Sequence, residues 1–408
     1  MIGTGPMYIA KKNKRHSHSG VVLALVIMAT VGSGAAVAGP REQAKRMHDR
    51  LAGVPPTEAV LTSMASKISS SDAVGAAMEA INNKDFYNVT LKNFAMPWTN
   101  EAQTVFAPLN DYVATVIGIV RDDIPFTDIL SGDVLYVATG VGSVPAYSMS
   151  NNDHYAQLEL QGIDLNANLV NVTQSSMTTL PAAATAGVMT SRAAAEAFFI
   201  DGTNRAMLRF TLLNHLCTDL EQIKDVTGVP DRIRQDVTRS PGGDSRIFMN
   251  ACIGCHIGMD PLTQAFAYYE YDKANTTIVY NDVGQTDPAT GSRVQAKYRI
   301  NSDNFKPGFI TTNDNWDNYW RKGPNRSLGW DGALPGSGSG AKSMGQELAK
   351  SNAFATCQVQ KVFKNVCLRS PIDAADRNQI SNMVGSFKSS NYNLKQVFAE
   401  SAVYCMGN

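Results

Sequence analysis

The stretch "NACIGCHIGMDPL", Asn250 to Leu262, carries the strongest signal in the sequence. Within it, Cys252, Cys255 and His256 form the pattern Cys-x-x-Cys-His. Two intervening residues place the two thiols about one helical turn apart. The pattern predicts a helical segment that presents two sulfur atoms and one imidazole on the same side.

A haem attached through two thioether bonds fits this spacing. The two thiols would add to the two vinyl groups on one edge of the ring, and His256 would offer its imidazole to the iron. A zinc site would need a second pair of ligands, and a thioredoxin-like dithiol would need a preceding strand in a βαβ context. The sequence offers neither, so we predict one covalent haem c held by Cys252, Cys255 and His256.

The first 38 residues have the features of a cleaved export signal. A basic segment, "KKNKRH" at 11–16, precedes the apolar run "VVLALVIMATV" at 21–31 and the small-residue site "AVA" at 36–38. The alternative is a membrane anchor, which needs about 20 apolar residues. We expect a mature chain that begins near Gly39, is periplasmic or otherwise exported, and contacts no membrane.

Composition indicates an ordered globular protein. Of the 408 residues, 44% are hydrophobic and 18% are charged. Cleavage after Ala38 would remove four of the 36 basic residues and none of the 36 acidic ones. The resulting slight excess of negative charge gives no reason to expect nucleic acid as a partner.

The mature chain is expected to be mainly α-helical, with a domain boundary near the turn cluster "SPGGDSR" at 240–246. Residues 39–240 would form a mainly helical region of unknown role. Apolar residues recur at helical spacing in "PREQAKRMHDRLAG" (40–53), "SDAVGAAMEAINN" (71–83) and, as the longest candidate, "EAQTVFAPLNDYVATVIGIVRDD" (101–123).

Residues 241–408 would form the haem-binding domain, with a low-helix insertion at about 275–340. Short strands are expected at "TTIVY" (276–280) and "AKYRI" (296–300), and a flexible connector at "PGSGSG" (335–340). Apolar periodicity predicts three helices in the segment that closes the chain.

The segment "CIGCHIGMDPLTQAFAYYEYD", which begins at Cys252, resembles the uncharacterised cytochrome c-like domains of planctomycete-type cytochromes. Residues 345–402 are similar to the helical domain that closes those proteins. The resemblance covers roughly 235–408. It implies an exported monohaem c-type cytochrome with a cytochrome c-like helical fold, and it implies no substrate.

The sixth iron ligand is the open question at this site. Met259 lies too close to His256 to reach the opposite face of the ring. Met344 follows the connector at 335–340 and is the first choice, with His215 and Met383 behind it. The alternative for Met344 is a packing residue at the start of a helix, since most methionines belong to the core. An open sixth position would favour a ligand-binding or peroxidatic haem.

The remaining cysteines are Cys217, Cys357, Cys367 and Cys405. In an oxidising compartment an even number of cysteines favours disulfides, and four allow three pairings. We predict Cys367–Cys405 and Cys217–Cys357, because Cys367 and Cys405 each end a predicted helix. The alternative is reduced, buried cysteines.

Three functions fit these features. The first is an exported cytochrome that transfers single electrons between redox protein partners. The second is an enzyme, peroxidase-like or another oxidoreductase, with a five-coordinate haem and a substrate pocket in the N-terminal region. The third is a structural haem subunit of an exported redox complex. No catalytic residue is predicted, and electron transfer is preferred over catalysis.

Overall fold

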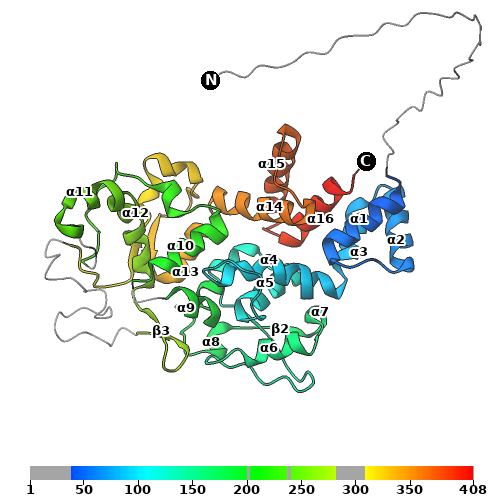
Figure 1. Ribbon diagram of the computed structural model, residues 1–408, viewed down its shortest axis with the longest axis horizontal. Helices are drawn as coiled ribbons and strands as arrows, with labels where there is room; N and C mark the ends of the chain where they lie inside the picture. The colour runs from blue at the N-terminus through cyan, green and yellow to red at the C-terminus, as the bar shows by residue number, and fades with distance from the viewer. Residues whose placement is uncertain (1–37, 200–202, 236, 238–239, 282–307, 408) are drawn as a thin grey trace, which may run out of the picture. The chain divides into compact units, whose positions relative to one another are not determined.

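The computed structural model describes residues 38–199, 203–235, 237, 240–281 and 308–407. These residues belong to one compact unit and are mainly helical, as predicted, with three short two-stranded sheets (Figure 1). The proposed export signal, apart from Ala38, and the expected strand at 296–300 lie outside the described residues. The domain boundary near 240 stays a prediction.

Three helices open the described chain: α1 (Pro40–Ala52), α2 (Glu58–Ser69) and α3 (Ala73–Ile81). Local signals fix their starts, since the side chain of Thr57 accepts a hydrogen bond from the backbone of Val60 and Asp72 accepts one from Gly75. Helices α1 and α3 pack on each other and on α16 (Leu394–Cys405), which ends the chain. The two ends of the described chain therefore share one helical packing arrangement.

Helix α5 (Asp111–Arg121) is the central element of the next region, because every residue of it except Arg121 is buried. Helix α5 packs on η1 (Phe86–Leu91), α4 (Lys92–Ala95), η2 (Met96–Thr99), η3 (Phe126–Leu130), α7 (Leu165–Asn168), η4 (Gly187–Thr190) and α9 (Arg192–Phe198). The same region contains α6 (Asp153–Leu160), α8 (Gln174–Met177), α10 (Arg205–Thr211), η5 (Leu212–Leu216) and η6 (Leu220–Ile223). Strand β1 (Leu135–Ala138) pairs antiparallel with β2 (Leu169–Val172).

The prediction of one long helix over 101–123 is wrong in its first half. The helix begins only at Asp111, where the side chain of Asn110 accepts a hydrogen bond from the backbone of Val113. Pro108 lies just before this point and disfavours helical backbone at the residue that precedes it. Phe106 lies in the segment before the helix and is 93% exposed, so the buried apolar face that begins with Leu109 does not extend back through it.

Between Thr263 and residue 340, the part of the chain that the structure describes contains few helices. Helix α11 (Ser245–Ile247), η8 (Phe248–Cys252), α12 (Ile253–Thr263) and η9 (Gln264–Phe266) precede the hairpin of β3 (Tyr269–Asp272) and β4 (Thr277–Tyr280). The strand predicted at 276–280 is confirmed. The described residues from 308 to 339 contain only short elements: β5 (Asn315–Asp317), η11 (Tyr319–Arg321), η12 (Pro324–Leu328) and β6 (Ser337–Ser339).

The prediction of a flexible connector at 335–340 is wrong. Residues Ser337–Ser339 form β6, which pairs antiparallel with β5. Gly338 lies opposite Trp316 in this register, and a Cβ atom on it would come within 3.1 Å of the indole. The small residues here allow close packing in a strand pair. A Gly- and Ser-rich composition alone does not distinguish this role from that of a flexible connector.

Four helices close the chain: α13 (Gly340–Ala349), α14 (Asn352–Cys367), α15 (Ala374–Ser389) and α16. The last three match the predicted helices. Side chains of Ser351, Asp373 and Asn393 accept hydrogen bonds at their first turns. Helix α14 packs against both α15 and α16 (Figure 1).

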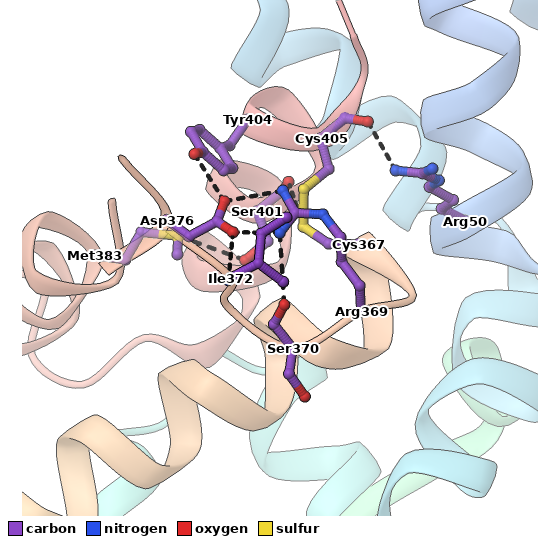
Figure 2. Close-up of a disulfide and its surroundings, with 10 residues drawn as sticks. All are labelled: Arg50, Cys367, Arg369, Ser370, Ile372, Asp376, Met383, Ser401, Tyr404 and Cys405. Carbon is purple, nitrogen blue, oxygen red and sulfur yellow. Dashed lines mark hydrogen bonds and ion pairs between the residues drawn. A yellow bond between two sulfur atoms is a disulfide. The ribbon is translucent and has the colours of Figure 1, made fainter. Parts of the chain in front are cut away.

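Both predicted disulfides are present. Cys217 bonds to Cys357, and Cys367, the last residue of α14, bonds to Cys405, the last residue of α16 (Figure 2). Disulfides are typical of proteins from oxidising compartments. Among the described residues, no helix combines the length and apolar character that crossing a membrane requires.

Candidate haem site

The Cys-x-x-Cys-His motif lies where a π-helical turn leads into an α-helix. Phe248–Cys252 form the π-helical turn η8, and α12 continues from Ile253. Within α12 every residue is buried except Cys255 and His256, and Cys252, directly before the helix, is also partly exposed. The accessible side of this helix therefore consists of the two thiols and the imidazole that the sequence predicts as haem-binding groups.

The thiols of Cys252 and Cys255 form no disulfide, whereas the other four cysteines form two. Of the cysteines that the structure describes, only Cys252 and Cys255 are outside disulfides. Burial raises the pKa of the Cys255 thiol above its usual range.

The imidazole of His256 is held by the carboxylate of Asp260, one helical turn further along α12. Its Nδ1 atom lies 3.1 Å from Oδ1 and 3.2 Å from Oδ2 of Asp260. Because an ionised carboxylate can only accept, Nδ1 carries the proton in this hydrogen bond. The Nε2 atom makes no hydrogen bond to any residue that the structure describes, so its lone pair is available to a metal ion.

Asp260 is fully buried and surrounded by donors. Arg205 binds both of its oxygens, with Nε 2.8 Å from Oδ1 and Nη2 3.0 Å from Oδ2, and the backbone N–H of Arg234 donates to Oδ2 at 3.1 Å. Burial alone would raise the pKa of Asp260, but the charge of Arg205 and the hydrogen bond from His256 outweigh it and hold the pKa well below its usual range. Asp260 is therefore ionised at neutral pH.

The rest of α12 is fixed by close packing. The ring of Phe248 lies 6.4 Å from that of His256, and Phe248 belongs to a small apolar cluster with Ile253, Ile257 and Ile233. On another side, Trp320 packs so closely on Gly258 that a Cβ atom there would lie 2.0 Å from the indole nitrogen. The helix that carries the motif is therefore held on several sides.

These residues fit a covalently bound haem c. The two free thiols and the unbonded Nε2 atom share the accessible side of the helix, and the buried carboxylate on Nδ1 selects the imidazole tautomer that an iron ligand needs. Cys252 and Cys255 would hold the ring, and His256 would bind the iron.

The candidate ligands for the opposite face lie inside packed regions. Met344 is fully buried on α13, which packs against η3 and η9. The argument for Met344 from a flexible connector fails, because β6 is an ordered strand, but the assignment itself stays a prediction. His215 is also buried, with Nε2 2.8 Å from the hydroxyl of Tyr112, and Met383 accepts a hydrogen bond from Ser401 at its sulfur.

The sequence did not reveal the roles of Asp260, Arg205 and Arg234. The spacing His256-x-x-x-Asp260 on a predicted helix is a usable signal, because residues four apart face each other. Arg205 and Arg234 have no such signal, since only the folded chain brings them to Asp260. Comparisons of the chain with protein-family models, with curated proteins and with solved structures found no match.

Proposed function

We propose that this protein is an exported c-type cytochrome that carries one covalent haem and transfers single electrons between redox protein partners. The observation that carries the proposal is the state of His256. Its Nδ1 atom is bonded to a buried carboxylate and its Nε2 atom is unbonded, next to the only thiols that the described structure leaves free. A chance occurrence of the motif would not require this arrangement.

Each residue has a defined part in this proposal. Cys252 and Cys255 would each form one thioether bond and keep the ring attached in every redox state. His256 would be the iron ligand on the side of α12, and Asp260 would orient its imidazole. The haem supplies the one-electron chemistry.

The partial exposure of the motif supports electron transfer over catalysis at a deeply buried haem. Cys252, Cys255 and His256 are partly exposed, and the two apolar side chains just before them, Ile247 and Met249, are 46% and 56% exposed. A haem edge at such a surface would be accessible to a partner. Redox partners need only small, transient interfaces. We also propose that residues 241–408 form a cytochrome c-like domain and that the protein functions in the periplasm or another exported location, which the two disulfides support.

The direct test is covalent haem attachment in a host that has the attachment machinery. Denatured wild-type protein should retain haem through acid–acetone extraction, and the Cys252→Ala/Cys255→Ala variant should lose it. A matched control is Cys367→Ala/Cys405→Ala, which also removes two cysteines but should keep the haem. Wild-type protein that releases all of its haem would refute the proposal.

A five-coordinate haem enzyme is the second candidate. The observation in its favour is the Asp260 carboxylate on Nδ1 of His256, because such a partner makes an imidazole ligand more basic. Carbon monoxide binding separates the two candidates. Rapid binding by the reduced wild-type protein would indicate an open sixth position and favour the enzyme.

A further inference from the structure

The hydrogen-bond network behind His256 has a consequence for the redox properties of the site. We infer that Asp260 is a positioning residue that fixes the tautomer of His256 and strengthens Nε2 as an iron ligand, and that Arg205 limits this effect. The inference rests on the proposed haem site. It concerns the regulation of the reduction potential, on which the motif itself carries no information.

The geometry holds Asp260 and His256 rigidly together. They are four residues apart on one helix, so their side chains lie on the same face. Both carboxylate oxygens are within 3.2 Å of Nδ1, and the carboxylate is fully buried, so water does not compete for the hydrogen bond. The imidazole plane and its protonated nitrogen are therefore set before any ligand binds at Nε2.

Arg205 competes with His256 for the same carboxylate. Its guanidinium binds both oxygens in a two-point pairing, and the backbone N–H of Arg234 adds a third donor. The preceding residue, Asn204, is buried and donates to the carbonyl oxygens of Phe266 and Tyr269, so the start of α10 is anchored to the segment that follows α12. The carboxylate charge is thus shared among several donors, and the proton remains on Nδ1.

The direction of each expected shift in reduction potential follows from the sharing of the Asp260 carboxylate between His256 and Arg205. A carboxylate on Nδ1 increases the electron density at Nε2, which stabilises ferric iron more than ferrous iron and lowers the reduction potential. Removing the charge of Asp260 should therefore raise the potential. Removing Arg205 should leave the carboxylate free to attract the Nδ1 proton more strongly, so the potential should fall.

The test is a redox titration of the haem-loaded full chain, followed by its optical spectrum. Asp260→Asn should shift the ferric–ferrous equilibrium about tenfold toward ferrous iron, which is about 59 mV for one electron. Arg205→Gln should shift it in the opposite direction. The matched control is Asp376→Asn, which removes another buried carboxylate, paired with Arg369 but not with a histidine, and should leave the potential unchanged.

A second measurement separates the hydrogen bond from a general charge effect. In the reduced protein, the proton resonance of His256 Nδ1–H should move downfield in Arg205→Gln, because its bond to Asp260 becomes stronger. An unchanged potential in Asp260→Asn, or shifts of the same sign in both variants, would overturn the inference. If Asp260→Asn does not fold, an unchanged or raised potential in Arg205→Gln overturns it. A wild-type protein without haem overturns both this inference and the proposed function, whereas haem-loaded variants with unchanged potentials overturn the inference alone.

Discussion

The guanidinium of Arg50 on α1 donates a hydrogen bond of 2.7 Å to the backbone carbonyl of Cys405, the last residue of α16 (Figure 2). Two further α1 side chains do the same, since Arg46 donates to the carbonyl of Met406 and Gln43 to that of Gly407. Carbonyl groups at a helix C-terminus lack partners within the helix, and cationic side chains there also interact favourably with the helix dipole. The first described helix therefore caps the last one.

This cap should contribute measurably to stability. Arg50→Met keeps most of the side-chain stem and removes the hydrogen bond, so the free energy of unfolding should fall by about 1 kcal/mol in urea denaturation. The control is Arg41→Met on the same helix, whose ion pair with Glu58 is exposed on both sides and should cost under about 0.5 kcal/mol. Equal losses in the two variants would contradict the capping role.

The Cys367–Cys405 disulfide should stabilise the C-terminal helices, because it closes a loop and thereby lowers the conformational entropy of the unfolded chain. The two cysteines are 38 residues apart, and loop-closure entropy for that length corresponds to about 4 kcal/mol. Cys367→Ala/Cys405→Ala should therefore lower the free energy of unfolding by several kcal/mol. A loss below about 1 kcal/mol would show that the packing of α14 against α16 is sufficient without the bond.

Asp376, beside this disulfide, should make stability depend on pH in the acid range. Arg369 pairs with both of its oxygens, and the backbone of Ile372 and the hydroxyl of Tyr404 also donate to it (Figure 2). The hydrogen bonds from Arg369 outweigh the effect of burial and hold the pKa of Asp376 well below its usual range. A carboxylate with a depressed folded-state pKa contributes stability at neutral pH that is lost as the pH falls below about 4.

The variant Arg369→Gln tests this dependence. At pH 7 it should unfold at a lower temperature than the wild type. The difference in unfolding temperature should narrow toward pH 3, because protonation of Asp376 progressively removes from the wild type the ion pair that the variant already lacks. A difference that stays constant between pH 7 and pH 3 would mean that Arg369 stabilises the fold by packing and not through the charge of Asp376.

Local patterns in the sequence predict the helices well where caps and periodicity agree. Apolar periodicity predicts α14, α15 and α16, and the structure shows that the side chains of Ser351, Asp373 and Asn393 cap their first turns. The Cys367–Cys405 disulfide follows from the same reasoning, because each cysteine ends one of these helices. The second pair, Cys217–Cys357, then follows by elimination.

Features that depend on distant residues were not predictable in this way. The pairing of β6 with β5 depends on how Gly338 fits against Trp316, and no pattern within 335–340 expresses that contact. The candidate haem site was likewise predictable only in part. The motif predicts the groups that would hold a haem, but the residues that orient His256 come from α10 and from the segment around Arg234, and tertiary folding alone brings them together.

The role of Met344 can be decided by comparing two substitutions. Met344→Leu nearly conserves volume and should cost less than about 1.5 kcal/mol of stability, whereas Met344→Ala should cost about 2–5 kcal/mol, because the side chain is fully buried. If Met344 binds the iron, both variants should lose the far-red charge-transfer band of thioether-ligated ferric haem and should bind carbon monoxide. A Met344→Leu protein with an unchanged spectrum would assign Met344 to the core.

Gly258 should be required for the packing of α12, and a second helical glycine provides its control. In Gly258→Ala the new methyl group would lie 2.0 Å from the indole nitrogen of Trp320, which is itself buried, so either α12 or the segment of Trp320 must move. Overpacking of this kind costs about 1–3 kcal/mol.

In Gly385→Ala, on α15, the methyl group meets no atom within 4 Å, and the higher helix propensity of alanine should raise stability by up to about 1 kcal/mol. Urea denaturation should therefore give opposite signs for the two variants. Because α12 carries His256, Gly258→Ala should also alter the optical spectrum of the haem-loaded protein, whereas Gly385→Ala should not. A Gly258→Ala protein as stable as the wild type would show that Trp320 can withdraw without cost and does not hold the helix in place.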